Sequence, residues 1–188
     1  MVDELPELRL PLPARDDCDF GALYDRRFDE VCRWARVLGA PSADLEDLVQ
    51  EVFIIVQRQL PRFDGRNLQG WLFRITQRTV RDHRRSAWFR RVLHLGDLPS
   101  TEESEPTRVD SPHEALERKQ RQVMLRRVLG RMSETRRVAF ELFELEGYSG
   151  EEIAQLLEIP VATVWTRLHH ARRSFLDAVQ QLAPEVQS

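Results

Sequence analysis

Polar and basic side chains gather on one face of a predicted helix near the C-terminus. This face carries no acidic residue before Asp177. Hydroxyl, imidazole, indole and guanidinium groups hydrogen-bond to base edges and phosphates, which indicates recognition of duplex DNA. The candidate residues are Thr163, Trp165, Thr166, Arg167, His169, His170, Arg172 and Arg173.

The element that must position these side chains is a predicted pair of helices joined by a short turn. Ser149 and Glu152 have the Ser-x-x-Glu spacing of a capping box, and Pro160 interrupts the helix that follows. A helix with an apolar seam and a polar outer face, set after a tight turn, fits the major groove. Such patterns are short, so an ordinary helical hairpin with a solvated basic face is the alternative. The predicted seam is Val161, Val164, Leu168, Ala171 and Phe175.

A second basic helix is predicted to begin near Asn67. Between Arg62 and Arg91 there are nine arginines but only two acids, Asp64 and Asp82, and aromatic residues lie among them. Arginine binds phosphates and aromatic rings stack on exposed bases, so this composition favours nucleic-acid binding. The candidate residues are Arg74, Arg78, Arg81, His83, Arg84 and Arg85.

A third predicted helix, starting near Asp44, carries acids in its first two turns. Carboxylates there interact favourably with the positive end of the helix dipole, which is a sufficient structural reason for them. The same face can also be a docking surface for a protein partner.

Charge and composition divide the 188 residues into two modules, although the net charge is only −3. Between Asp97 and Glu117 there are seven acids and one arginine, and Gly, Pro and Ser are frequent from 92 to 111. We therefore predict an all-α protein with helical modules at 19–91 and 112–182, joined by an acidic, flexible linker at 92–111. Residues 1–18 are predicted to be a flexible arm, and 183–188 a loose tail.

Several classes of function lack their sequence signals. Cys18 and Cys32 form no metal-ligand motif, and there is no Gly-rich phosphate loop or nucleophile motif, so we expect no metal, cofactor, small-molecule substrate or enzymatic activity. No apolar run is long enough to span a membrane, and the N-terminus does not resemble a signal peptide. We expect a cytoplasmic protein with no membrane insertion.

Two segments resemble one family. DLEDLVQEVFIIVQRQLPRF followed by WLFRITQRTVRDHRR resembles region 2 of the extracytoplasmic-function (ECF) sigma factors of the sigma-70 family, and GYSGEEIAQLLEIPVATVWTRLHHARRSFL resembles their region 4. The resemblance implies that the helix at 71–85 binds and melts the −10 promoter element, that 161–173 reads the −35 element, and that an anti-sigma factor restrains the protein. It implies docking on core RNA polymerase through Asp44, Asp47, Leu48, Gln50, Glu51 and Phe53.

The chain departs from the family pattern at some DNA-facing positions. Trp165 stands where many members have a cation, and Arg78 stands where an asparagine is common. Three alternatives are open at this point: a stand-alone helix-turn-helix regulator that binds duplex DNA without polymerase, an enzyme, and an interaction protein that binds no DNA. The basic, aromatic helix near Trp71 favours the sigma factor over the stand-alone regulator.

Overall fold

The computed structural model describes residues 19–93 and 112–182, and the side chains of 19–86 and 120–181. Within these ranges the chain is helical and contains no strand, which confirms the all-α prediction. The predicted arm at 1–18 and the tail at 183–188 lie outside the described residues, as does nearly all of the predicted linker. Among the described helices, none is both long and apolar enough to cross a bilayer.

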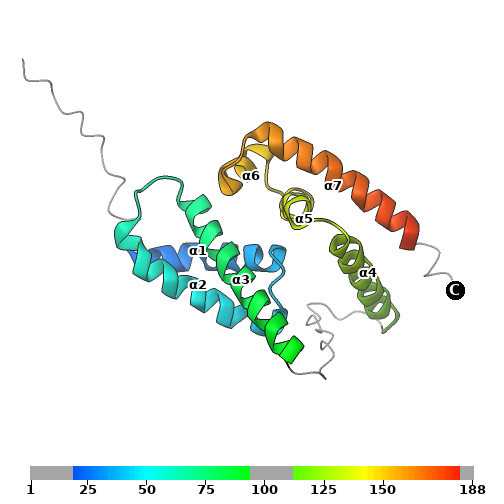
Figure 1. The fold of residues 1–188 in the computed structure, drawn as a ribbon, viewed down its shortest axis with the longest axis horizontal. Coiled ribbons are helices and arrows are strands. Elements are labelled where there is room, and N and C mark those ends of the chain that lie inside the picture. Colours follow the sequence, from blue (N-terminus) through cyan, green and yellow to red (C-terminus); the bar gives the residue numbers. More distant parts are fainter. Residues whose placement is uncertain (1–18, 94–111, 183–188) are drawn as a thin grey trace, which may run out of the picture.

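The N-terminal module consists of three helices that pack on one another (Figure 1). They are α1 (Phe20–Val37), α2 (Leu45–Gln59) and α3 (Leu68–Leu93). Asp19 caps α1 by accepting a hydrogen bond from the backbone N–H of Gly21. Gly39 follows this helix at φ +87°, a conformation that glycine adopts without strain. This helix therefore begins at a side-chain cap and ends just before a glycine in the left-handed conformation.

The C-terminal module is built around the long helix α7 (Val161–Leu182), which packs against α4 (Pro112–Gly130), α5 (Glu134–Phe140) and α6 (Gly150–Leu157) (Figure 1). A π-helical turn at Glu141–Leu145 follows α5. The capping box at Ser149 and Glu152 is present, and its hydrogen bonds hold the pKa of the Glu152 carboxyl below its ordinary value.

Two residues of types that commonly cap helices precede α2 and α5 without forming the capping hydrogen bond. Asp44 precedes α2 and Ser133 precedes α5, but neither side chain accepts a bond from its helix. A short 3-10 turn at Ser42–Asp44 leads into α2 instead, so the polypeptide is already helical at Asp44.

The two modules share a hydrophobic core. One continuous cluster of buried side chains contains Trp34 and Leu72 of the N-terminal module together with Leu142, Ile153 and Leu168 of the C-terminal module. A smaller cluster, which includes Leu129, Met132, Phe140 and Ala171, holds α4 and α5 against α7. The C-terminal module is therefore packed against the N-terminal module, and α3 contacts α6 directly.

Candidate nucleic-acid interface

The inner face of α7 is fixed by burial, and this decides which residues point outward. Val164, Leu168 and Ala171 are fully buried, whereas Val161, predicted to lie in the same seam, is 39% exposed because it begins the helix. Thr163 and Arg167 are half-buried at the edges of the outer face. The exposed members of the predicted site are Trp165, Thr166, His169, His170, Arg172 and Arg173.

Trp165 has one side packed and the other open. Its ring meets Phe143 edge-on, with the centroids 5.6 Å apart, and lies over the backbone of Gly150 at the start of α6. The side chain is still 45% exposed. An indole held in this way offers a flat apolar surface that suits contact with a thymine methyl group or a sugar.

Two other side chains on this face already have partners within the module. The Arg172 Nε atom lies 2.7 Å from a carboxylate oxygen of Glu144, and its guanidinium carbon lies 5.3 Å from the ring centroid of Phe143. Thr166 donates its hydroxyl hydrogen to the carbonyl of Ala162, which leaves the hydroxyl oxygen free to accept a hydrogen bond from a base. The charge of Arg172 is therefore partly neutralised, and the Thr166 hydroxyl is available only as a hydrogen-bond acceptor.

The outer face of α3 carries the second candidate site. Arg78 and Arg81 are 79% and 68% exposed, and both lie within 4.0 Å of the single carboxylate of Asp82, which cannot neutralise two cations. Arg85 is exposed as well. Arg84 differs, because it donates a hydrogen bond to the Leu38 carbonyl at the end of α1. A net positive surface remains along the middle of α3.

Two members of the predicted −10 site contact other parts of the protein. Arg74 donates to Glu158 of the C-terminal module at 2.7 Å. The Nε2 atom of His83 lies 3.5 Å from the Asp44 carboxylate, and its Nδ1 atom is buried. His83 therefore connects α3 to the start of α2, and its side chain is only 20% exposed. Sequence reasoning had assigned Asp44 and His83 to different binding surfaces.

The predicted docking helix α2 divides its candidate residues between surface and core. Asp47, Gln50 and Glu51 are exposed, whereas Leu48 and Phe53 are each only 2% exposed. Phe53 belongs to an aromatic cluster with Phe20, Tyr24 and Phe28 of α1. Leu48 and Phe53 therefore pack in the core beneath α2 and are not part of its exposed surface.

Ile54 was missed by sequence reasoning. It is 48% exposed on α2, although it is a large aliphatic side chain. A signal was available, because Val49, Val52 and Val56 mark the buried stripe at three- and four-residue spacing, and Ile54 lies off it. Ile54 therefore offers apolar area beside the exposed acids of the helix.

Comparison with known protein families identifies both helical modules. Residues 23–90 match Sigma-70 region 2, and residues 122–175 match Sigma-70, region 4. The ECF RNA polymerase sigma factor SigL of Mycobacterium tuberculosis is 33% identical over 165 residues, which cover 86% of this chain and 89% of that protein. This chain belongs to the ECF sigma factors.

Other sigma factors support the assignment. The ECF RNA polymerase sigma-E factor of Escherichia coli is 31% identical over 147 residues, covering 76% of this chain and 77% of that protein. The solved structure of CnrH in complex with the cytosolic domain of CnrY matches 86% of this sigma factor and 88% of that chain, with a TM-score of 0.56 and 25% identity. A second complex, of RpoE with the anti-sigma factor NepR from Bartonella quintana, has the same fold at a TM-score of 0.62 and 21% identity. The resemblance inferred from two sequence segments is confirmed.

Proposed function

We propose that this sigma factor uses three separate surfaces in transcription initiation, one for core RNA polymerase, one for the −10 element and one for the −35 element. The protein binds core RNA polymerase and directs it to promoters by recognising a −35 element as duplex and by melting a −10 element. The observation that carries this conclusion is the presence of both sigma regions in one chain, in the family order, together with a relative matched over 89% of its length.

The polymerase-docking surface is assigned to the exposed side of α2. Asp47, Gln50 and Glu51 supply charge and hydrogen-bonding groups there, and Ile54 supplies apolar area. Buried apolar area and a polar surround are the usual composition of a protein interface. Asp44 contributes less directly, because its carboxylate lies beside His83.

The −10 surface is assigned to Arg78, Arg81 and Arg85 of α3. Arg84 lies at the edge of this surface. Arg74 becomes part of it when its ion pair with Glu158 is broken. Melting a promoter requires no bond-making chemistry. It requires a surface on which an unpaired base is more stable than a stacked one. Stacking on an aromatic ring contributes about 1–3 kcal/mol per base, similar to the cost of unstacking a weak step. Among the described side chains of α3, Phe73 is buried and Trp71 is half-buried, so the arginines carry this assignment by holding the strand through its phosphates.

The −35 surface is assigned to the exposed side of α7. Thr166, His169 and His170 lie where a recognition helix contacts base edges, and Arg173 and Arg167 lie nearer the phosphates. Trp165 adds an apolar contact in place of the usual cation. Thr163 borders this surface, and Arg172 contributes once it is released from Glu144.

A protein partner is also proposed. The related sigma factor CnrH was solved in complex with the cytosolic domain of CnrY. Its match to 86% of this chain supports a comparable restraint here, by an anti-sigma factor that covers the polymerase-docking or DNA-binding surfaces. A stand-alone regulator that binds duplex DNA without polymerase does not require sigma region 2. The match to that region at 23–90 therefore argues against this alternative.

The test is run-off transcription with purified core RNA polymerase on fragments of the native chromosome. We expect RNA from defined start sites only when the sigma factor is added. The double variant Arg78→Ala/Arg81→Ala should lose most of this activity. The double variant Arg126→Ala/Arg127→Ala removes the same charge from exposed positions of α4 and is the matched control. Specific binding of duplex DNA without polymerase, together with no run-off product on any fragment, would contradict the proposal.

A further inference from the structure

We propose that Trp165 and Thr166 make this sigma factor select A·T base pairs in its −35 element, through the thymine methyl group and the adenine amine. The inference rests on the proposed function, because it names the bases that the −35 surface reads. Both residues lie in the first two turns of α7, the part of a recognition helix that contacts base edges in the major groove.

The ring of Trp165 is held in place by two contacts on its packed side. It meets Phe143 at an interplanar angle of 72°, with the ring centroids 5.6 Å apart. The indole atoms Cζ2, Cε2 and Cη2 lie 2.6 to 3.1 Å from the point where a Cβ atom at Gly150 would be. The residue is nevertheless 45% exposed. The indole therefore offers a fixed apolar surface, which loses little conformational entropy when a ligand covers it.

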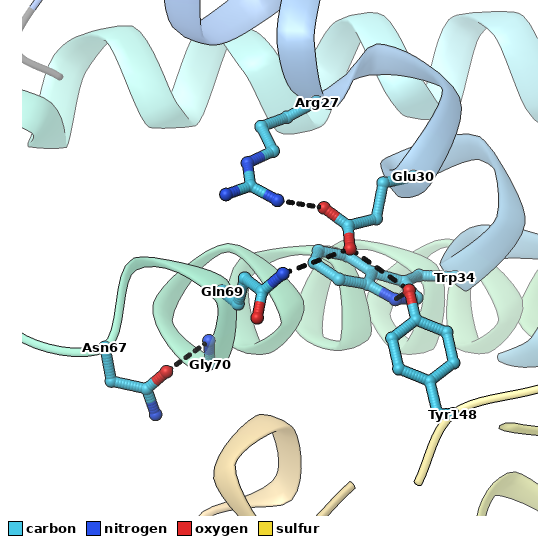
Figure 2. Close-up of polar contacts among 7 residues, drawn as sticks. All are labelled: Arg27, Glu30, Trp34, Asn67, Gln69, Gly70 and Tyr148. Atoms are coloured by element: carbon cyan, nitrogen blue, oxygen red, sulfur yellow. Dashed lines mark hydrogen bonds and ion pairs between the residues drawn. The ribbon is translucent and has the colours of Figure 1, made fainter. Parts of the chain in front are cut away.

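The backbone beneath the ring is fixed as well. Ser149 and Glu152, on either side of the glycine, exchange the two hydrogen bonds of the capping box. The hydroxyl of Tyr148, the residue before them, accepts from the Trp34 indole N–H and donates to Glu30, both at 3.1 Å (Figure 2). The ring therefore rests on a backbone that is held by its own hydrogen bonds.

An indole at this position reads a different base from a cation. Arginine and lysine bind guanine through hydrogen bonds to both O6 and N7, whereas an indole has one N–H donor and no acceptor. The group in the major groove that suits its apolar surface is the C5 methyl of thymine, which cytosine lacks. Trp165 therefore favours thymine over cytosine and gives up the bidentate contact to guanine.

The Thr166 hydroxyl acts as an acceptor towards DNA. It donates its hydrogen to the Ala162 carbonyl at 2.9 Å, one turn earlier in α7. The lone pairs of the oxygen are left for a partner, and the residue is exposed. In the major groove the hydrogen-bond donors are the N6 amine of adenine and the N4 amine of cytosine. The A·T pair alone presents both an amine and a methyl group, so Trp165 and Thr166 together favour it.

The three arginines of α7 are engaged or placed elsewhere on the helix. Arg172 pairs with Glu144 at 2.7 Å, and Arg167 is half-buried. Arg173 is exposed, but it lies eight positions after Trp165, about 12 Å further along the helix axis. Apolar area and a hydroxyl acceptor therefore characterise the exposed surface in the first two turns of the helix.

The test removes single groups from the promoter DNA and asks which side chain registers the loss. A promoter obtained from the run-off experiment is synthesised with one substitution at each −35 position in turn. Deoxyuridine in place of thymidine removes only the methyl group, and purine deoxyriboside in place of deoxyadenosine removes only the amine. Initiation is measured at limiting holoenzyme, where it follows the affinity for the promoter.

The protein variants remove the matching groups from the surface. Trp165→Ala and Trp165→Lys delete the indole. Thr166→Val replaces the hydroxyl by a methyl group of similar size, and Thr166→Ser keeps the hydroxyl. Leu176→Ala is the matched control, because Leu176 is a large apolar residue, 60% exposed, on the same side of α7 but about three turns beyond Trp165.

We expect deoxyuridine at a −35 thymidine to lower initiation by the parent about three- to ten-fold, part of the cost of a mismatched pair. Trp165→Ala and Trp165→Lys should respond equally to thymidine and deoxyuridine, and Trp165→Lys should gain about a ten-fold preference for G·C at that position. Thr166→Val should lose the response to the missing amine, and Thr166→Ser should retain it. Leu176→Ala should respond to every substitution as the parent does.

The assignment is overturned if deoxyuridine at no −35 position lowers initiation by the parent, a measurement that needs no variant. It is also overturned if the deoxyuridine effect persists in Trp165→Ala, or the amine effect in Thr166→Val. An equal loss by Trp165→Ala on every −35 sequence would assign the ring to a protein or backbone contact instead. Thermal unfolding shows that each variant is folded. Absence of run-off product from every native fragment is a different result, because it contradicts the proposed function itself.

Discussion

The indole ring of Trp165 fills the space that a side chain at Gly150 would need. A Cβ atom at Gly150 would lie 2.6 Å from Cζ2 of Trp165, closer than non-bonded carbon atoms approach. Gly150 begins α6 and Trp165 lies in the second turn of α7, so this contact fixes the spacing of the two helices of the helix-turn-helix. The identity of a glycine on one helix thereby sets the position of a half-exposed ring on the other.

The first prediction concerns this contact. Gly150→Ala should displace the Trp165 ring and lower initiation at promoters that depend on their −35 element, by about ten-fold if one contact to a base pair is lost. Gly130→Ala is the matched control, because a Cβ there meets nothing within 4 Å. Run-off transcription on −35 variants measures the effect. Equal activity of the two alanine variants would show that the ring position does not matter.

The second prediction concerns the ion pair between Glu144 and Arg172. Glu144→Gln should free the arginine for a phosphate and strengthen promoter binding by the holoenzyme about two- to five-fold, the range of an exposed ion pair. The salt dependence should steepen by about one unit of log-log slope. Filter binding over a salt series measures both quantities.

The control for this experiment is Glu134→Gln, which removes one exposed carboxylate from α5 in the same module. It should leave the slope unchanged. Weaker binding by Glu144→Gln would mean that Glu144 positions Arg172 for DNA instead of competing with DNA for it.

The third prediction is a pH dependence of stability. Burial raises the pKa of the Glu141 carboxyl from its ordinary value to about 7, with Glu146 adding to the rise and the Arg137 guanidinium opposing it. The folded protein thus binds this proton more tightly than the unfolded chain does. The stabilisation is present in full below about pH 4.5 and is lost as the pH rises through about 7.

Glu141→Gln, which mimics the protonated side chain, should therefore be more stable than the parent at pH 8 and almost equally stable at about pH 4. A shift of this size corresponds to at most about 3 kcal/mol, which solvent screening reduces to about 1–2 kcal/mol. Urea unfolding at the two pH values measures the difference. A variant that is less stable than the parent at pH 8 would show that the ion pair with Arg137 outweighs burial.

The fourth prediction separates packing from docking on α2. Phe53→Ala should lower the free energy of unfolding by about 3–5 kcal/mol, as expected for a buried aromatic residue. Ile54→Ser should change stability little, because the side chain is half exposed, yet weaken binding to core polymerase by about ten-fold or more. Thermal unfolding and a core-binding titration distinguish the two. Normal polymerase affinity in Ile54→Ser would remove this residue from the docking surface.

The sequence by itself determined the helices and the family. Capping at Ser149 and Glu152, interruption at Pro160 and apolar spacing along α7 are local signals, since each depends on residues within one or two helical turns. The two family segments could be identified for the same reason. Each is short and continuous, so no long-range contact is needed to recognise it.

Only the tertiary structure decided which candidate side chains are available. Arg74 pairs with Glu158 at a distance of 84 positions along the chain, and Tyr148 bonds to Glu30 across 118. His83 and Asp44 meet although sequence reasoning assigned them to separate surfaces. Contacts between residues so far apart in the sequence depend on how whole helices pack together, because packing is determined by the burial and shape of complete helix faces. The local spacing of residues in the sequence therefore does not predict these long-range contacts.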